Sequence, residues 1–323
     1  MRLFLAPMEG VVDHTLRKLL TDIGGVDLCV TEFIRVTDHL LPTRVFQRYC
    51  PELSHNSQTP SGVPVRVQLL GGKPDPVAAN AAKAADLGAC AIDLNFGCPA
   101  KTVNKSDGGA CLLQTPHRLY DIIKACREQV PHPIPVTAKM RLGYEDRSRY
   151  MDNALAAYEA GANELTVHAR SKADGYRPPA YWEAIADIQA ALDIPVIANG
   201  EIWSVADFQR CREVSQCKDF MVGRGLLACP DLGRQIKAFV NSEDYQPMNW
   251  ADICHVLQIF FDITCDAYAD KYMGNRLKQW LHYLRRQYPQ AEHLFETIKR
   301  YKQKPLIDQA ISESMHADFA QPA

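Results

Sequence analysis

The chain has 323 residues, of which 47% are hydrophobic and 23% charged, so it can form one large globular domain and a smaller one. Its apolar runs stop short of the roughly 18 residues that a membrane helix needs. The N-terminus has one basic residue and then Pro7 and Glu9, which is typical of a first strand and not of a secretion signal. These features predict a cytoplasmic protein without membrane segments.

Short apolar runs alternate with helix-like stretches over the first part of the chain. The predicted strands are 2–7, 27–32, 65–71, 90–97, 134–143, 164–170, 194–202 and 219–225. The later runs are continuously apolar, as in strands that are buried on both faces. Eight strand–helix units predict a (β/α)8 TIM barrel over residues 1–243, with a doubly wound open sheet as the alternative. Polar residues at the ends of the strands favour the barrel, because barrel enzymes place their sites there.

After about residue 245 the pattern becomes helical. The stretches 250–272, 275–288 and 291–303 have helical apolar spacing, and no strand is predicted among them. We therefore expect a smaller all-helical domain over residues 244–323, with 316–323 frayed at its end.

Charge is distributed unevenly between these two parts. The net charge is −2, but residues 271–304 contain nine lysines and arginines against two glutamates, a local charge of +7 that leaves −9 elsewhere. Such a cluster has two interpretations: it is a solvent-exposed face of helices, or it is a positively charged surface that binds a polyanion such as nucleic acid.

The chain has eleven cysteines, and their spacing excludes two common roles. The number is odd and no two form a C-x-x-C pair, so neither a disulfide framework nor a structural zinc site is expected. We predict no metal site and mostly buried thiols.

Two glycine-bearing loops follow the last two predicted strands. They are Asn199-Gly200-Glu201 and Gly223-Arg224-Gly225. The corresponding loops of many barrels bind phosphate, because small residues let backbone N–H groups approach an anion. Either loop alone is explained by a simple turn, whereas the two together on these strands favour a phosphate site.

Other polar residues lie at the ends of the middle strands. Lys139 is unusual within a buried strand and is either a lysine at the barrel rim or a cation that faces developing negative charge. Gln68 and Asn95 offer donors and acceptors to a heterocycle, although each also suits a satisfied core amide. From the residues alone, His168 suits a core histidine better than a ligand contact, and Arg170 is two positions away on the same strand.

Cys98 lies between glycine and proline in the sequence NFGCPAKT. It has three interpretations: an inert buried thiol, a metal ligand without nearby partners, or a catalytic thiol on an exposed loop. The loop context favours catalysis, and spacing leaves open whether the thiol is a nucleophile or a proton donor. The following loop contains Lys105 and Asp107, for which the sequence offers no role.

The assembled motifs resemble the tRNA-dihydrouridine synthase family, most closely its DusC type. The motifs are LAPMEGVVD, VQLLGGKP, DLNFGCPAKTVNKSDGGACLL, KMRLG, ELTVHAR, VIANGEIW and MVGRGLL. They cover the barrel, and CDAYAD and NRLKQWLHYLRRQY resemble the helical tRNA-binding domain of the family. The resemblance therefore implies an FMN-binding catalytic barrel at 1–243 and a tRNA-binding domain at 244–323.

The resemblance also implies roles for individual residues. FMN would be contacted by Pro7, Met8, Glu9, Gln68, Lys139, His168, Asn199, Gly200, Glu201, Gly223 and Arg224. NADPH would reduce the flavin, the flavin would pass hydride to carbon 6 of a uridine, and Cys98 would protonate carbon 5 as a general acid. The tRNA contacts would be Arg35, Asn95, Tyr176, Arg276 and Lys278. Arg170 would lie near the flavin or the phosphates.

The expected function is thus NADPH-driven reduction of a D-loop uridine in tRNA, with uridine 16 implied by the DusC type. The expected protein is a monomer without a protein partner. One alternative is a flavin-dependent barrel that reduces a free pyrimidine or another small metabolite, which would have no need of the basic helices. Another is a barrel without redox chemistry that binds RNA or a sugar phosphate.

Overall fold

The computed structural model describes residues 1–267 and 272–316. Lys271 of the basic segment and the expected frayed residues 317–323 lie outside the described residues. The chain divides into two compact units, one made of Met1–Arg17 and Val26–Gly223 and the other of Lys18–Gly25 and Arg224–Ala323.

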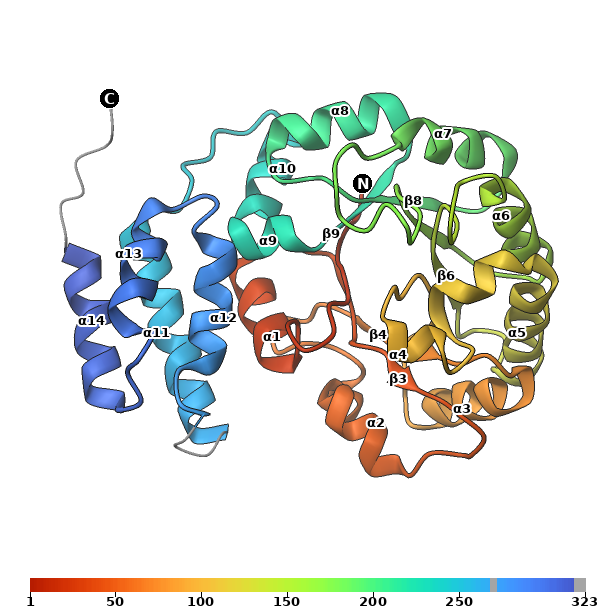
Figure 1. Cartoon of the computed structure of the whole chain (residues 1–323), viewed down its shortest axis with the longest axis horizontal. Coiled ribbons are helices and arrows are strands. Elements are labelled where there is room, and N and C mark those ends of the chain that lie inside the picture. The colour runs from red at the N-terminus through yellow and green to blue at the C-terminus, as the bar shows by residue number, and fades with distance from the viewer. Residues whose placement is uncertain (268–271, 317–323) are drawn as a thin grey trace. The chain divides into compact units, whose positions relative to one another are not determined.

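Within its described residues, the first unit contains the predicted closed barrel of eight parallel strands (Figure 1). The barrel strands are β1 (Leu3–Leu5), β2 (Leu28–Val30), β4 (Val65–Leu70), β5 (Ile92–Phe96), β6 (Val136–Arg141), β7 (Leu165–His168), β8 (Val196–Asn199) and β9 (Asp219–Val222). Neighbours along the chain pair in parallel, and β1 pairs with both β2 and β9. Pairing of Cys29 with Val65 joins β2 to β4 and completes the closed sheet. The open-sheet alternative is therefore wrong.

Helices follow the strands and surround the sheet (Figure 1). They are α1 (His14–Ile23), α2 (Thr43–Tyr49), α3 (Pro74–Asp86), α5 (Pro116–Gln129), α6 (Tyr150–Glu159), α7 (Trp182–Ala191) and α8 (Val205–Ser215). Proline occupies the first position of α3 and α5, where a missing N–H costs no helical hydrogen bond. The Ser204 side chain accepts a hydrogen bond from the Asp207 N–H and caps α8.

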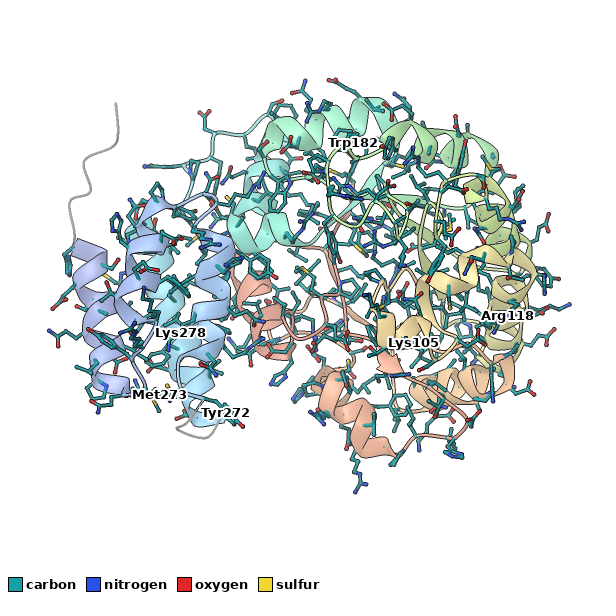
Figure 2. The ribbon with its side chains drawn as sticks, in the orientation of Figure 1. Lys105, Arg118, Trp182, Tyr272, Met273 and Lys278 are labelled. Carbon is teal, nitrogen blue, oxygen red and sulfur yellow. The ribbon has the colours of Figure 1, made fainter. Side chains whose placement is uncertain are left out.

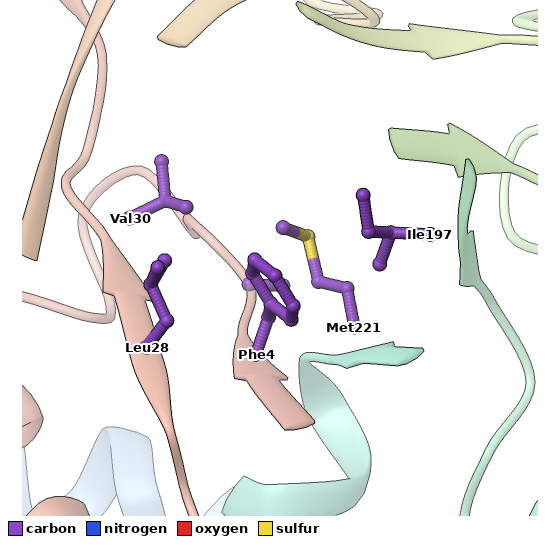
Figure 3. Close-up of a cluster of buried hydrophobic side chains, with 6 residues drawn as sticks. Phe4, Leu28, Val30, Ile197 and Met221 are labelled. Carbon is purple, nitrogen blue, oxygen red and sulfur yellow. The ribbon is translucent and has the colours of Figure 1, made fainter. Parts of the chain in front are cut away.

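Apolar side chains from four strands form one cluster of the barrel core (Figure 3). Phe4, Leu28, Val30, Ile197 and Met221 are at most 9% exposed and come from β1, β2, β8 and β9. Strands buried on both faces explain why the sequence shows continuous apolar runs and not alternation.

Charged residues join the strands at their amino ends. Arg2 binds Glu164 and Asp219, each at 2.6 Å, and Arg66 binds the same glutamate at 2.6 Å. This ion network lies at the end of the barrel opposite the carboxyl ends of the strands, so it contributes to the scaffold and not to the predicted site.

Several short elements were not predicted from the sequence. They are β3 (Ile34–Arg35), α4 (Lys101–Asn104), and the 3-10 helices η1 (Pro51–His55) and η2 (Gly109–Gln114). β3 lies beside β4, with Ile34 paired to Leu69. Elements of two to six residues span too few turns or alternations to give a periodic signal.

The second unit contains the helices α9 (Arg224–Ala228), α10 (Leu232–Asn241), α11 (Trp250–Ala267), α12 (Asn275–Leu284), α13 (Pro289–Ile298) and α14 (Lys304–His316). The predicted helical stretches coincide with α11, α12 and most of α13, although residues 268–271 of the first stretch lie outside the described residues. The helix α14 was not predicted. Tryptophans connect these helices, because Trp280 Nε1 donates to Leu227 O at 3.0 Å and Trp250 Nε1 to Ser314 O at 3.1 Å. Phe260 packs edge-on against Trp280, with ring centroids 5.0 Å apart.

Among the residues that the structure describes, none of the helices is both long and apolar enough to cross a bilayer.

Candidate active site

Cys98 lies in a loop that follows β5 and that is fixed by hydrogen bonds on both sides. Its backbone N–H donates to Asn95 Oδ1 at 2.9 Å, and its carbonyl accepts from Ala110 N at 3.1 Å and Asn104 Nδ2 at 3.1 Å. Gly109 has φ +69°, and a Cβ there would lie 2.9 Å from Cys98 O. The loop therefore requires glycine at this close backbone approach.

Cys98 is only 8% exposed, so the expectation that this residue lies on an exposed loop is wrong, because the loop folds over it. Burial raises the pKa of the Cys98 thiol above the usual value, Glu9 adds to this shift, and Arg141 and Arg35 act against it. A thiol with a raised pKa keeps its proton at neutral pH, which suits a proton donor better than a nucleophilic thiolate.

A chain of side-chain hydrogen bonds leads from this loop into the barrel. Asn95 Nδ2 donates to Gln68 Oε1 at 2.8 Å, and Gln68 Nε2 donates to Asp93 Oδ2 at 2.7 Å. The other oxygen of Asp93 accepts from the Thr137 hydroxyl at 2.6 Å. The structure thus brings the predicted Gln68 and Asn95 together with Cys98, and it adds Asp93 and Thr137.

Lys139 projects from β6, and its Nζ donates to Asn199 Oδ1 at 3.1 Å. Burial lowers the Lys139 pKa to about 8, with a smaller contribution from Arg141, while Asp93 and Cys98 act in the opposite direction. The lysine is therefore a cation at neutral pH that loses its proton far more readily than a surface lysine.

Arg141 connects the Cys98 loop to the loop after β7. Its Nε donates to Gly97 O at 2.9 Å, and its Nη1 donates to Ser171 O and Gly175 O, each at 3.0 Å. Its guanidinium lies 5.2 Å from the Tyr176 ring centroid, a cation–π distance. The predicted Tyr176 is 53% exposed, so it presents an aromatic surface beside this loop.

His168 and Arg170 have different surroundings, although they are two positions apart. His168 is 7% exposed at the end of β7, with its ring edge-on to Tyr176 at 6.1 Å. Arg170 is fully buried, pairs with Glu201 and donates from Nε to Arg177 O at 2.7 Å. Arg170 therefore holds the loops that follow β7 and β8.

The predicted phosphate loops show the backbone geometry that glycine allows. Gly200 has φ +116°, and a Cβ on Gly223 would lie 3.2 Å from Met8 Sδ. Glu201 has φ +60° and is held by Arg170 and by Trp203 Nε1, which donates to Glu201 Oε1 at 3.0 Å. Small residues here leave room beside Met8, which packs at the end of β1.

The remaining predicted residues come from other elements of the fold. Arg35 is exposed on β3, where its Nη2 contacts Thr102 O at 3.5 Å. Arg224, Arg276 and Lys278 belong to the second unit. Pro7 and Glu9 follow β1, and Glu9 is close enough to influence the Cys98 thiol.

The structure gives Asp107 a contact that the sequence did not reveal. Its carboxylate pairs with Arg118 of α5 (labelled in Figure 2) at 2.5 Å, and Arg118 also donates to Gly72 O at 2.9 Å. Asp107 has φ +61°, and a Cβ on Gly72 would lie 1.7 Å from Asp107 O. Asp107 therefore fastens the far end of the Cys98 loop, whereas Lys105 is exposed on that loop.

No role was predicted from the sequence for Asp93, Thr137 or Asp107. For Asp93 a signal was present, because an acidic residue inside the apolar run 90–94 must find partners when it is buried. Those partners come from two neighbouring strands, and this pairing is visible only in the folded sheet. In the described part of the chain, no three His, Cys, Asp or Glu side chains are placed to hold a metal ion.

The fold and the site together define a TIM-barrel protein with a cysteine, a lysine and two amides at the carboxyl ends of its strands. The chain belongs to the dihydrouridine synthase (Dus) family, whose domain matches residues 4–316.

Curated relatives resemble nearly the whole chain. A tRNA-dihydrouridine(16) synthase from Shewanella oneidensis is 51% identical over 98% of this chain and 99% of its own length. Proteins of the same name from Pseudomonas putida and Escherichia coli are 52% and 47% identical, over 93% and 96% of this chain and 93% and 98% of theirs.

Solved structures share the fold at much lower identity. A 2-naphthoyl-CoA reductase complex has 12% identity and a TM-score of 0.56 over 75% of this chain and 50% of that chain. A variant of NCR from Zymomonas mobilis has 13% identity and a TM-score of 0.52 over 78% of this chain and 90% of that one.

Proposed function

We propose that this chain is a flavin-dependent tRNA-dihydrouridine synthase that reduces uridine 16 in the D-loop of tRNA. The observation that supports this most directly is the buried Cys98, hydrogen-bonded through its backbone to Asn95 and close to Lys139 at the mouth of the barrel. Relatives at about 50% identity that bear this name support the choice of base and position.

The residues at the barrel mouth suit an FMN group. Gln68 and Lys139 offer donors to a heterocycle that presents acceptor atoms. Gly200 and Gly223 leave the backbone open to a phosphate, and Met8 lies against Gly223. When bound and reduced by NADPH, FMN would supply the hydride that carbon 6 of the uracil receives.

The chain's own residues supply the other requirements of the reaction. Adding hydride to carbon 6 leaves negative charge toward carbon 5, so a proton must arrive there. Cys98 holds that proton, because burial keeps its thiol neutral. Lys139 places a positive charge where electron density rises, and Asn95 has an amide N–H available for a carbonyl of the base. Tyr176 offers a surface on which a flipped base can stack.

The remaining assignments belong to the same proposal. Residues 1–243 form the catalytic domain, and residues 244–323 bind tRNA with Arg276 and Lys278. Pro7, Met8, Glu9, His168, Asn199, Glu201 and Arg224 complete the flavin site, and Arg35 contacts the RNA. The enzyme acts in the cytoplasm, where its substrate is found.

Replacement of Cys98 by alanine tests the proton-donor role. Cys98→Ala should leave flavin reduction by NADPH within about twofold of wild type and slow dihydrouridine formation by about 10²–10⁴-fold, the usual contribution of a general acid. The two half-reactions are followed separately, by flavin absorbance and by mass spectrometry of the tRNA. Cys111→Ala, in η2 of the same region, is the matched control and should retain both steps.

Normal turnover by Cys98→Ala would refute the proton-donor assignment. Reoxidation of the reduced enzyme by free uridine as fast as by tRNA would instead favour the small-metabolite alternative. Dihydrouridine found only at another position would refute the assignment to uridine 16.

A further inference from the structure

The hydrogen-bond chain from Asp93 to Cys98 has a polarity that both of its ends determine. At one end the Gly97 and Cys98 backbone N–H groups donate to Asn95 Oδ1, each at 2.9 Å. Backbone N–H groups can only donate, so the oxygen of this amide must face them and its nitrogen must face Gln68. Gln68 then turns its oxygen to Asn95 and its nitrogen to Asp93.

The other end of the chain imposes the same order. Asp93 is 2% exposed and receives Gln68 Nε2 on one oxygen and the Thr137 hydroxyl on the other. Desolvation raises the pKa of Asp93, and the hydrogen bonds from Thr137 and Gln68 and the cations Arg66 and Lys139 oppose that shift. In either protonation state an oxygen of this carboxyl group can accept from Gln68 Nε2, which is the only donor that the Gln68 side chain has once its oxygen accepts from Asn95.

We propose that Asp93 is a positioning residue whose buried carboxylate, acting through Gln68 and Asn95, holds the Cys98 loop and fixes both amides as hydrogen-bond donors toward the ligand. The oxygen of Asn95 is already occupied by two N–H groups, so this side chain has only one N–H to offer. Such a donor recognises a carbonyl oxygen and disfavours an amino group at the same place. Only the identity of that carbonyl, on a uracil, rests on the proposed function.

The polarity can be reversed by exchanging two isosteric side chains. Asn95→Asp keeps an acceptor for the two backbone N–H groups but places a carboxylate against Gln68 Oε1. Gln68 must then turn its amide, which brings its oxygen against the Asp93 carboxylate. Asp93→Asn in the same chain removes this conflict, because the new amide can donate to Gln68 and still accept from Thr137.

The test compares Asn95→Asp with the double variant Asp93→Asn/Asn95→Asp in the full-length protein. Alkylation of Cys98 by iodoacetamide, measured by peptide mapping, should be about tenfold faster in Asn95→Asp and return to within about threefold of wild type in the double variant. The thermal midpoint should fall and recover in the same way. Asp219→Asn/Asn95→Asp is the matched control, since it removes a buried carboxylate of the distant ion network, and it should not recover.

Dihydrouridine formation should be slowed at least 10²-fold in both Asn95→Asp and the double variant, because an acceptor replaces the donor that faces the base. Failure of the double variant to recover either the alkylation rate or the thermal midpoint would overturn the role of Asp93. These two measurements need no tRNA. Inactivity of the wild-type protein on tRNA would therefore count against the proposed function and leave the role of Asp93 to be judged separately.

Discussion

At the scale of single residues, burial gives Cys98 and Lys139 opposite tendencies that both suit uracil reduction. Burial raises the pKa of the Cys98 thiol, so the thiol keeps its proton at neutral pH. It lowers the pKa of Lys139 to about 8, which is close to the pH at which enzymes work. A solvent-exposed cysteine or lysine would have neither property, because water would stabilise the thiolate and the ammonium.

The Lys139 pKa of about 8 predicts how the reductive half-reaction depends on pH. Its ammonium is charged below that pH and neutral above it, so the rate of flavin reduction by NADPH should be level below pH 8 and fall above it. In the proposed mechanism Cys98 acts only after this step, so the profile isolates the lysine. Stopped-flow absorbance over pH 6–10 measures the rate.

Lys139→Met provides the control for this profile. The variant should reduce its flavin about 10²-fold more slowly and without a change near pH 8, because it has no charge to lose. If the variant retains the same break in its profile, another titratable group is responsible, and the nearby Asp93 and Cys98 would have to be tested.

Single residues also show which parts of the site cannot be predicted from the sequence. Cys98, Gln68, Asn95 and Lys139 could be found because polar residues at the ends of apolar strands are conspicuous. The partner of each could not be found, because hydrogen bonds such as Lys139 to Asn199 join residues that are 60 positions apart. Asp93 connects strands in the same way, and strand register is not visible in one sequence.

At the scale of the elements, the barrel strands and most of their helices could be predicted, because apolar runs alternate regularly with helical patterns. The helix α2 was not predicted. Short elements such as β3 and α4 depend on tertiary contacts and gave no signal. The helix α14 was not predicted, although its buried Ile307 and Ile311 have helical spacing.

The α1 helix offers a direct comparison of buried and exposed ion pairs. Arg17 is fully buried and binds Glu52 of η1 at 2.9 Å, with further donation to Tyr49 O at 3.0 Å. Glu52→Gln should lower the free energy of unfolding by about 3–5 kcal/mol, because it leaves a buried guanidinium without its counter-ion. Urea denaturation monitored by fluorescence measures this change.

The control is the exposed pair on the same helix, Lys18 with Asp22 at 2.5 Å. Asp22→Asn should change the free energy of unfolding by less than about 1 kcal/mol, since water screens this pair. Equal losses of unfolding free energy in the two variants would show that burial does not determine how much the Arg17–Glu52 ion pair stabilises the protein.

At the scale of the whole molecule, charge is divided between the two parts of the chain. The site that we propose for flavin and uracil lies in a unit that has most of the acidic residues, and the basic segment 271–304 lies in the helical unit. Such a division suits an enzyme whose substrate is a polyanion with a single reacting base, since phosphate contacts supply affinity and the barrel supplies chemistry.

The two basic residues assigned to tRNA binding are not equivalent in the structure. Lys278 (labelled in Figure 2) donates from Nζ to Tyr301 O at 2.8 Å, and burial lowers its pKa. Arg276 Nη1 donates to Gln279 Oε1 at 2.7 Å on α12. A planar guanidinium matches a phosphate with two parallel N–H groups, whereas an ammonium binds it as a point charge. Reversal of charge at Arg276 should therefore affect RNA binding more than reversal at Lys278.

Arg276→Glu should weaken tRNA binding by at least tenfold at low salt and reduce the slope of log Kd against log salt by about one, as expected for the loss of one phosphate contact. Filter binding at several salt concentrations measures both quantities, while flavin absorbance should stay unchanged. Lys218→Glu, an exposed lysine of the barrel unit, makes the same change in net charge and serves as the control. If both variants weaken binding equally, net charge alone governs the association and α12 is not the tRNA-binding surface.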